Sequence, residues 1–175
     1  KLLSAYLRPL GWNETIIQGD LVVQLISKVE VGPTIGGKPK FEKQTRKIRR
    51  EKYLDGHKVD YVKGRVAFDL EWNSKDQTFD RDLYAMSAFA QCGVIDVGVV
   101  VTRSESLNEM FRQLGPALKR NGEPDMKPSG LPRLTIEKYG ASTTWMGKLL
   151  YRLNAGRNGA CPVLAVGITP KCVVE

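Results

Sequence analysis

The sequence predicts an α/β fold in which helices flank a mixed central β-sheet. Two nearly continuous apolar runs, VIDVGVVVT at 94–102 and PVLAVGIT at 162–169, are rich in β-branched residues, which is typical of buried strands. A third stretch, at 57–73, has the alternation of a β-hairpin, and segments with helical periodicity separate the three. Strands that alternate with helices favour a layered α/β domain.

The hairpin is the stretch on which the functional interpretation depends. We place its turn at Lys63-Gly64, because glycine tolerates the positive φ that a two-residue turn requires. The second arm, VAFDLEWN at 66–73, alternates apolar residues with residues that are mostly acidic or amide. One face of this arm is therefore apolar and the other polar.

A two-residue loop at this position pairs Asp60 with Ala67, and residues opposite each other share a face. Asp60, Asp69 and Glu71 then point the same way, and Asp60 and Asp69 become diagonal neighbours roughly 7–8 Å apart. A loop longer by one residue would reverse the parity and separate the acids. Three acids this close repel one another unless a cation lies between them, and hard oxygen ligands suit Mg²⁺. A solvated polar face on an edge hairpin is the plainer alternative.

The remaining elements are predicted from periodicity and turn residues. We expect helices at 2–10, 79–92, 107–114 and 145–153, a basic helix at 40–53, and a loop at 32–39. For 15–30 both a strand and a helix are open, and the helix is favoured. The segment 115–131 is expected to be irregular, and without repeats or a linker the chain is predicted to be a single domain over 1–175.

Composition limits the classes of partner and compartment. The chain has 175 residues and a net charge of +8, which favours a polyanionic partner. Three cysteines without metal-ligand spacing predict a reduced, cytoplasmic protein with buried thiols, and a single histidine argues against a Ser-His-Asp triad. No apolar run is long enough for a bilayer and no signal peptide is visible, although the chain starts with Lys1 and its natural N-terminus is expected to be missing.

The stretches AFDLEWNSKDQTFDRDL, GVIDVGVVVTR, STTWMGKLLYRLNAG and CPVLAVGITP resemble type II restriction endonucleases of the BglII/BstYI kind. The likeness covers about the last two-thirds of the chain. It implies the PD-(D/E)xK nuclease fold, a homodimer, Mg²⁺, and cleavage of double-stranded DNA at a short palindrome. Members of this kind typically recognise sites centred on GATC and leave four-base 5′ overhangs.

By the same resemblance, Asp60 is the first metal ligand, and Asp69 and Glu71 take the places of the (D/E)-x-K pair. The sequence departs from the family pattern in two ways: Val59 replaces the usual proline, and Glu71 replaces the usual lysine. A shifted register, in which Glu71 is the second ligand and Asn73 the lysine substitute, is the second choice. A polar residue from the preceding helix, Glu42 or Thr45, could also contribute.

Candidate DNA contacts fall into two groups. The basic run is expected to neutralise phosphates without reading sequence, and segments that follow strands or precede a helix are expected to reach base edges. The candidates are Lys43, Arg46, Lys47, Arg50, Ser74, Lys75, Arg103, Ser142, Thr143 and Thr144. A helix N-cap is the plain alternative for 142–144, and Arg81 and Asp82 could form a local ion pair.

Two other functions compete with restriction. One is a different PD-(D/E)xK nuclease, of DNA repair or recombination, which would use the same acids but cut without a fixed sequence. The other is a basic DNA-binding module without catalysis.

Overall fold

A computed structural model describes residues 2–140 and 142–173. Its elements in chain order are α1 (Leu2–Leu7), η1 (Arg8–Leu10), β1 (Asn13–Pro33), β2 (Pro39–Lys63), β3 (Val66–Glu71), α2 (Thr78–Gln91), β4 (Val97–Arg103), α3 (Glu105–Gln113), α4 (Thr135–Lys138), α5 (Met146–Asn154), β5 (Val163–Ile168) and η2 (Pro170–Cys172). The chain divides into two compact units. The first comprises residues 1–15 and 59–175, and the second comprises 16–58.

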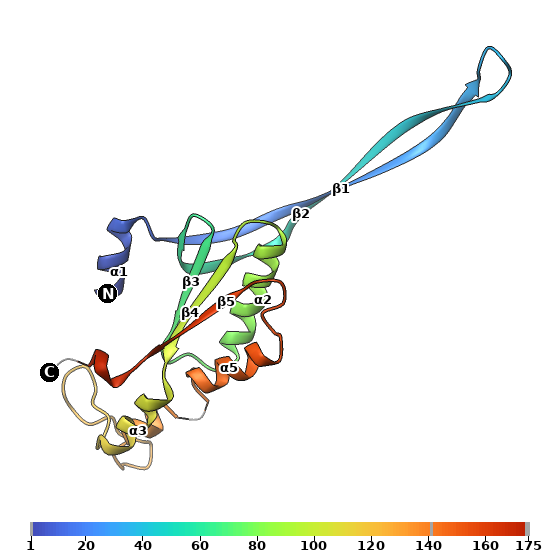
Figure 1. Cartoon of the computed structure of the whole chain (residues 1–175). Helices are drawn as coiled ribbons and strands as arrows, with labels where there is room; N and C mark the ends of the chain where they lie inside the picture. Colours follow the sequence, from blue (N-terminus) through green and yellow to red (C-terminus); the bar gives the residue numbers. More distant parts are fainter. Residues whose placement is uncertain (1, 141, 174–175) are drawn as a thin grey trace. The chain divides into compact units, whose positions relative to one another are not determined.

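The sheet of the first unit is mixed, as predicted. Strand β3 is antiparallel to the end of β2 and parallel to β4, and β4 is parallel to β5. The three strands β3, β4 and β5 lie side by side in Figure 1. The strands predicted at 94–102 and 162–169 are therefore confirmed as β4 and β5.

Helix α2 covers the sheet face that carries the acidic residues of β3. In the parallel register Ala67 pairs with Gly98 and Asp69 with Val100, so these four residues share one face. Gly98 allows the close approach of the helix, because a Cβ at this position would lie 2.4 Å from Sδ of Met86. A larger residue at position 98 would push α2 away from the sheet.

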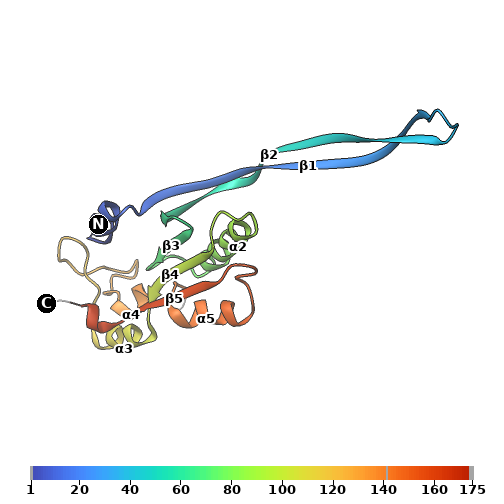
Figure 2. The same ribbon diagram turned by 45° about the horizontal axis from the view of Figure 1, so that its top comes forward.

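Helices α2 and α5 are neighbours (Figures 1 and 2), and ion pairs tie them together. Asp80 of α2 accepts hydrogen bonds from Arg152, at 2.9 Å, and from Arg157. Asp76, just before α2, accepts one from Lys148 at 3.0 Å. The helices predicted at 79–92, 107–114 and 145–153 are confirmed as α2, α3 and α5.

An aromatic cluster packs on the opposite face of the first unit's sheet. The ring of Phe68 lies 5.2 Å from that of Tyr61 and meets Trp12 edge-on at 6.3 Å. The hydroxyl groups of Tyr61 and Ser4 share a hydrogen bond of 2.7 Å, which fixes α1 beside the end of β2. The helix predicted at 2–10 is confirmed as α1 followed by η1.

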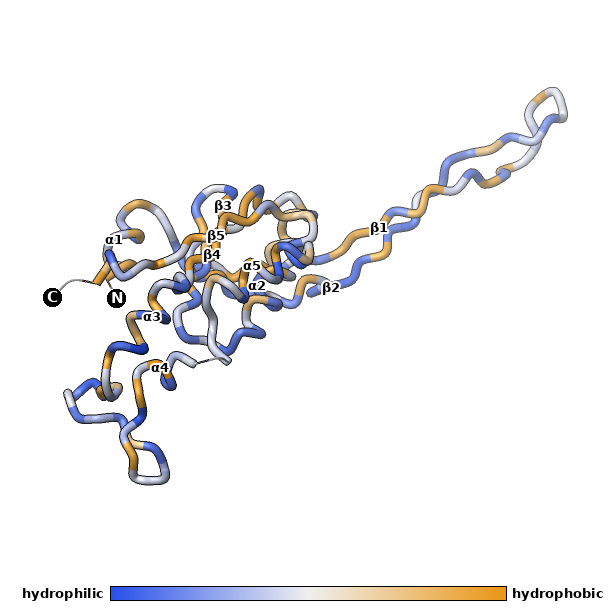
Figure 3. The backbone as a smooth tube through the Cα atoms, turned by 60° about the horizontal axis from the view of Figure 1, so that its bottom comes forward, coloured by the Kyte–Doolittle hydropathy of each residue, from blue (hydrophilic) through white to orange (hydrophobic). Residues whose placement is uncertain are grey.

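The second unit is a β-hairpin made of most of β1 and β2. Its tip closes at Thr34, whose backbone N–H donates to the carbonyl of Lys38 at 2.7 Å. Nearly all its side chains are exposed, and apolar and polar residues are interleaved along both strands (Figure 3). Asp20 accepts hydrogen bonds from the Arg49 side chain and from the backbone N–H of Lys52, which cross-links the two strands.

Two sequence predictions in this unit are wrong. The segment 15–30 is a strand where a helix was favoured, and the basic stretch 40–53 is a strand where a helix was expected. Lysine, arginine and glutamate have good helix propensity, but propensity is a weak guide when a partner strand is available. Glu42 and Thr45 accordingly lie on β2, not on a helix.

Two smaller features complete the fold. None of the helices in the described residues is long and apolar enough to cross a membrane. All three cysteines are free, but only Cys161 is buried; Cys92 and Cys172 are exposed, so the prediction of buried thiols holds for one of the three.

Candidate active site

The hairpin turn lies one residue later than predicted. Lys63 pairs with Val66, so the two-residue loop is Gly64-Arg65, and Gly64 has a φ of +56°. The Arg65 guanidinium binds Asp96 through two hydrogen bonds of 2.6 Å, which holds the second loop residue in place. The pairing is thereby shifted by two residues, which leaves the parity of the faces unchanged.

As a result, Asp60 and Asp69 are direct neighbours and not diagonal ones. The backbone N–H of Asp60 donates to Oδ1 of Asp69 at 2.9 Å, and the N–H of Leu70 donates to Oδ2 of Asp60 at 3.1 Å. The two strands thus hold both carboxylates through reciprocal hydrogen bonds. Glu71 lies two residues beyond Asp69 and on the same face of β3.

Both acids of β3 are deeply buried. Asp69 is 4% exposed, and burial raises its pKa to about 6, with smaller contributions from the charges of Asp60 and Glu71. Burial also raises the pKa of Glu71 to about 7; a hydrogen bond with Ser74 acts in the opposite direction, and the neighbouring Asp82 raises the pKa further. The site therefore disfavours the ionised forms of its own carboxyl groups.

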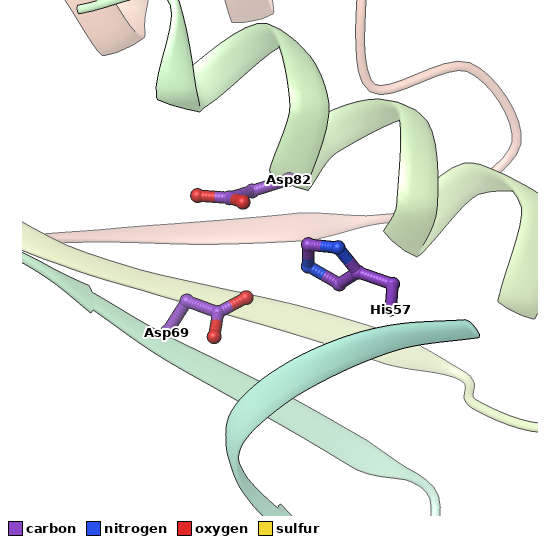
Figure 4. Close-up of side chains that lie close together, drawn as sticks. All are labelled: His57, Asp69 and Asp82. Atoms are coloured by element: carbon purple, nitrogen blue, oxygen red, sulfur yellow. The ribbon is translucent and has the colours of Figure 1, made fainter. Parts of the chain in front are cut away.

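A fourth acid, Asp82, reaches the same place from α2. Figure 4 shows its carboxylate facing that of Asp69, and each offers an oxygen within 4.8 Å of the other. Burial, followed by the charge of Asp69, raises the pKa of Asp82 to about 6. Arg81 pairs with Asp82 at 2.9 Å, as the sequence suggested. Figure 4 also labels His57, which belongs to the second unit.

Sequence reasoning missed the place of Asp82 in the site, although a signal was present. Phe79, Leu83 and Met86 form the buried stripe of α2, and Asp82 lies on that stripe with only 1% of its surface exposed. A carboxylate inside an apolar helix stripe needs a partner in the core, since an isolated buried charge is costly.

The donor set fits a divalent cation. Oδ2 of Asp69 and Oε2 of Glu71 are buried and have no hydrogen-bond partner among the described residues. A buried carboxylate oxygen without a donor loses solvation that a bound cation would replace. The oxygens of Asp69 and Glu71 are hard ligands whose carboxyl groups lack a compensating donor, and this combination suits Mg²⁺ or a similar ion.

The comparison with known families identifies the family of the chain. The chain matches the family of restriction endonucleases described as BglII/BglIII over residues 1–168. The chain belongs to the BglII restriction endonuclease family. No curated protein matches it significantly. It is thus a type II restriction endonuclease, a hydrolase that acts on DNA, and its mixed sheet with flanking helices is consistent with the fold of such enzymes.

The predicted base-reading segments of this BglII-family enzyme come together in space. The backbone N–H of Asp76 donates to the carbonyl of Ser142 at 3.0 Å, and that of Thr144 donates to the carbonyl of Ser74 at 2.9 Å. Lys75 and Thr143 face each other in an antiparallel bridge. We call these two paired segments the 74–76/142–144 bridge. The first of its two segments begins three residues after Glu71.

Three members of the predicted set are buried or hydrogen-bonded within the protein. Arg103 and Thr144 are fully buried, and the Thr143 hydroxyl accepts from Arg103 at 2.7 Å while donating to the Gly140 carbonyl. The structure thus buries two of the predicted base contacts, Arg103 and Thr144. Lys75 and Ser142 are exposed on the bridge.

The basic candidates are all exposed and lie on β2 of the second unit. They are Lys43, Arg46, Lys47 and Arg50, and none has a carboxylate partner among the described residues. Arg50 stacks over the ring of Tyr53 at 5.6 Å. In the whole second unit, ten lysines and arginines face five acids, so this BglII-family enzyme carries more than half of its net positive charge there.

Proposed function

We propose that this BglII-family enzyme is a homodimer that hydrolyses double-stranded DNA at a short palindrome centred on GATC, with Mg²⁺ and with 5′ overhangs. The observation that carries the metal-dependent part is the group of three buried or half-buried acids on neighbouring strands, two of which have an oxygen without a donor. The site specificity and the overhang follow from the family resemblance. A twofold protein suits a palindrome, because it presents the same surface to each half-site.

Asp60, Asp69 and Glu71 are the proposed metal ligands. When bound, Mg²⁺ supplies charge for the scissile phosphate and a water of lowered pKa. Asp69 is held for this role by the N–H of Asp60, and Asp60 by the N–H of Leu70. The Glu71 carboxylate orients the attacking water and accepts its proton. The bond from phosphorus to the 3′ oxygen breaks, and the leaving oxygen takes a proton from solvent water to become the 3′ hydroxyl.

The register with Asp69 and Glu71 is favoured over the one with Glu71 and Asn73. Asp69 contacts Asp60 directly, whereas Asn73 lies beyond the end of β3 and is exposed. In the proposed register, Asp82 adds a negative charge behind the ligands. The basic residues of β2 neutralise phosphates, and Ser74, Lys75 and Ser142 are the proposed base-reading side chains.

The direct test is digestion of a methyl-free plasmid pool with Mg²⁺, followed by run-off sequencing of the ends. Discrete fragments with a common GATC-centred end and a four-base 5′ overhang are expected. Asp69→Asn is the inactive variant, and Glu109→Gln, which changes an exposed acid on α3, is the matched control that retains cutting. A smear would instead assign the enzyme to sequence-independent nucleases, and cutting by Asp69→Asn would remove the proposed site.

The homodimer is tested separately by sedimentation of the enzyme with and without a cognate duplex. A mass of two chains on one duplex is expected, since one palindrome offers two half-sites. A single chain per duplex at saturation would contradict the dimer without affecting the metal site.

A further inference from the structure

Arg103 ends β4 as a fully buried cation, and its surroundings are unusual. Its guanidinium donates five hydrogen bonds, all to uncharged oxygens. They go to the Trp72 carbonyl at 3.0 Å, Asn108 Oδ1 at 3.2 Å, the Tyr139 carbonyl at 3.3 Å, Thr143 Oγ1 at 2.7 Å and the Thr144 carbonyl at 2.9 Å. The planar fork of arginine thus serves as a connector between backbone segments and not as half of an ion pair.

Two aromatic rings complete the burial of this charge. Cζ of Arg103 lies 5.6 Å from the centroid of Phe111 and 5.4 Å from that of Tyr139. Burial lowers the pKa of Arg103, so the fold bears a cost for keeping a cation here. An apolar side chain would fill the space without that cost, but it would leave the five oxygens without their donors.

Arg103 joins the chain just after Glu71 to residues of the 74–76/142–144 bridge. Trp72 follows Glu71 in the chain, and Thr102, next to Arg103, donates its hydroxyl to the Glu71 carbonyl at 2.7 Å. The last two residues of β4 therefore hold the carbonyl oxygens of Glu71 and Trp72. Through its other donors, Arg103 contacts Tyr139 and also Thr143 and Thr144, which belong to one side of the 74–76/142–144 bridge.

We propose that Arg103 is a positioning residue that couples DNA engagement at the 74–76/142–144 bridge to the placement of Glu71. It touches no DNA itself. When the bridge binds its correct base sequence, its position becomes fixed. The hydrogen bonds of Arg103 then fix the position of the Trp72 carbonyl, and so that of the strand that carries Glu71. This inference rests on the proposed function of Glu71 and of the bridge.

The consequence is a separation of affinity from cleavage. The basic residues of β2 supply sequence-independent affinity and belong to the second unit, whereas Arg103 and its hydrogen-bond partners belong to the first. Loss of the fork loosens the position of Glu71, and a displacement near 1 Å can cost about 100-fold in rate. Discrimination between the cognate site and a site with one changed base pair should fall as well.

The test uses Arg103→Lys, which keeps the charge but cannot reach all five acceptors. Single-turnover cleavage of a cognate duplex, cleavage of a one-base-changed duplex, and duplex affinity with Ca²⁺ replacing Mg²⁺ are measured together. We expect the cleavage rate to fall by about 100-fold, with affinity within about threefold of wild type and a smaller ratio of cognate to changed-site cleavage. Arg152→Lys is the matched control: Arg152 is also buried, but it pairs with Asp80 between α2 and α5, so its replacement should lower the melting temperature only.

Thr143→Val keeps the test decisive if Arg103→Lys fails to fold. It removes one acceptor of the fork and should reduce cleavage and discrimination in the same direction by a smaller factor. An unchanged cleavage rate in a folded variant would overturn the inference, as would a loss of affinity equal to the loss of rate, which would make Arg103 a DNA contact. If wild type cuts no DNA at all, the proposed function fails and not this inference alone.

Discussion

Replacing Asp69 by asparagine should make the metal-free enzyme more stable at pH 8 while it abolishes cleavage. The Asp69 carboxyl is 4% exposed, and its pKa is raised, first by burial, to about 6 from an ordinary value of 3.8. The folded protein therefore binds a proton that the unfolded chain releases between these two pH values. Stability falls as pH rises through this window, and the loss is complete above the folded pKa.

The size of the effect follows from the shift. A difference of about two pH units corresponds to about 3 kcal/mol at 1.36 kcal/mol per unit. Asparagine avoids this cost because it carries no charge, and its carbonyl can still accept the N–H of Asp60. Since an amide oxygen accepts more weakly than a carboxylate, we expect a net gain of about 1–3 kcal/mol, or about 2–12 °C in melting temperature for a chain of this size.

The assay is thermal or urea unfolding in EDTA at pH 4, 6 and 8 for wild type, Asp69→Asn and Glu109→Gln. The advantage of Asp69→Asn should be near zero at pH 4 and largest at pH 8, and Glu109→Gln should follow wild type. Saturating Mg²⁺ should stabilise wild type but not Asp69→Asn, because a bound ion stabilises only a folded protein that can bind it. An Asp69→Asn variant that is less stable than wild type at pH 8, or that differs from it equally at every pH, would refute the electrostatic reasoning.

Two further predictions concern the neighbours of the site and the basic strand. Ser74→Ala removes a hydrogen bond that lowers the pKa of Glu71. The rising limb of the pH–rate profile should therefore move to higher pH by about one unit. A profile that stays in place would contradict a role for ionised Glu71. The second prediction concerns a variant in which four basic residues become glutamine: Lys43, Arg46, Lys47 and Arg50. It should bind cognate and random duplexes more weakly alike, and the slope of log affinity against log salt, measured by fluorescence anisotropy, should fall by about 3 to 4. Weakening confined to the cognate duplex would refute phosphate contact.

The acidic face of the hairpin was predictable although its turn was misplaced. The turn was expected at Lys63-Gly64 and lies at Gly64-Arg65. Moving a two-residue loop by one position shifts the pairing by two, and side chains alternate with a period of two. Asp60 and Asp69 therefore stay on one face under either pairing. Parity is a more robust deduction than register, because only an odd error changes it.

The basic strand and Arg103 show where local pattern is insufficient. The stretch 40–53 is rich in residues with good helix propensity, and only its pairing with β1 makes it a strand. Arg103 follows an apolar run, a place where a charged residue commonly marks the exposed end of a strand. Its burial depends on Phe111 and Tyr139, which lie 8 and 36 residues further along the chain, and no local window contains both partners.

The elements around β3 each contribute one constraint to the same short strand. The end of β2 supplies Asp60 and its N–H, β4 supplies the Thr102 hydroxyl that holds the Glu71 carbonyl, and α2 supplies Asp82. The acids make the fold less stable at neutral pH, whereas the hydrogen bonds from both neighbouring strands keep their backbone in place. A site that is rigid in its backbone but electrostatically unsatisfied has a built-in preference for a cation. Of the net charge of +8, the second unit carries five charges, from ten lysines and arginines against five acids, and there the basic residues of β2 are proposed to meet phosphates.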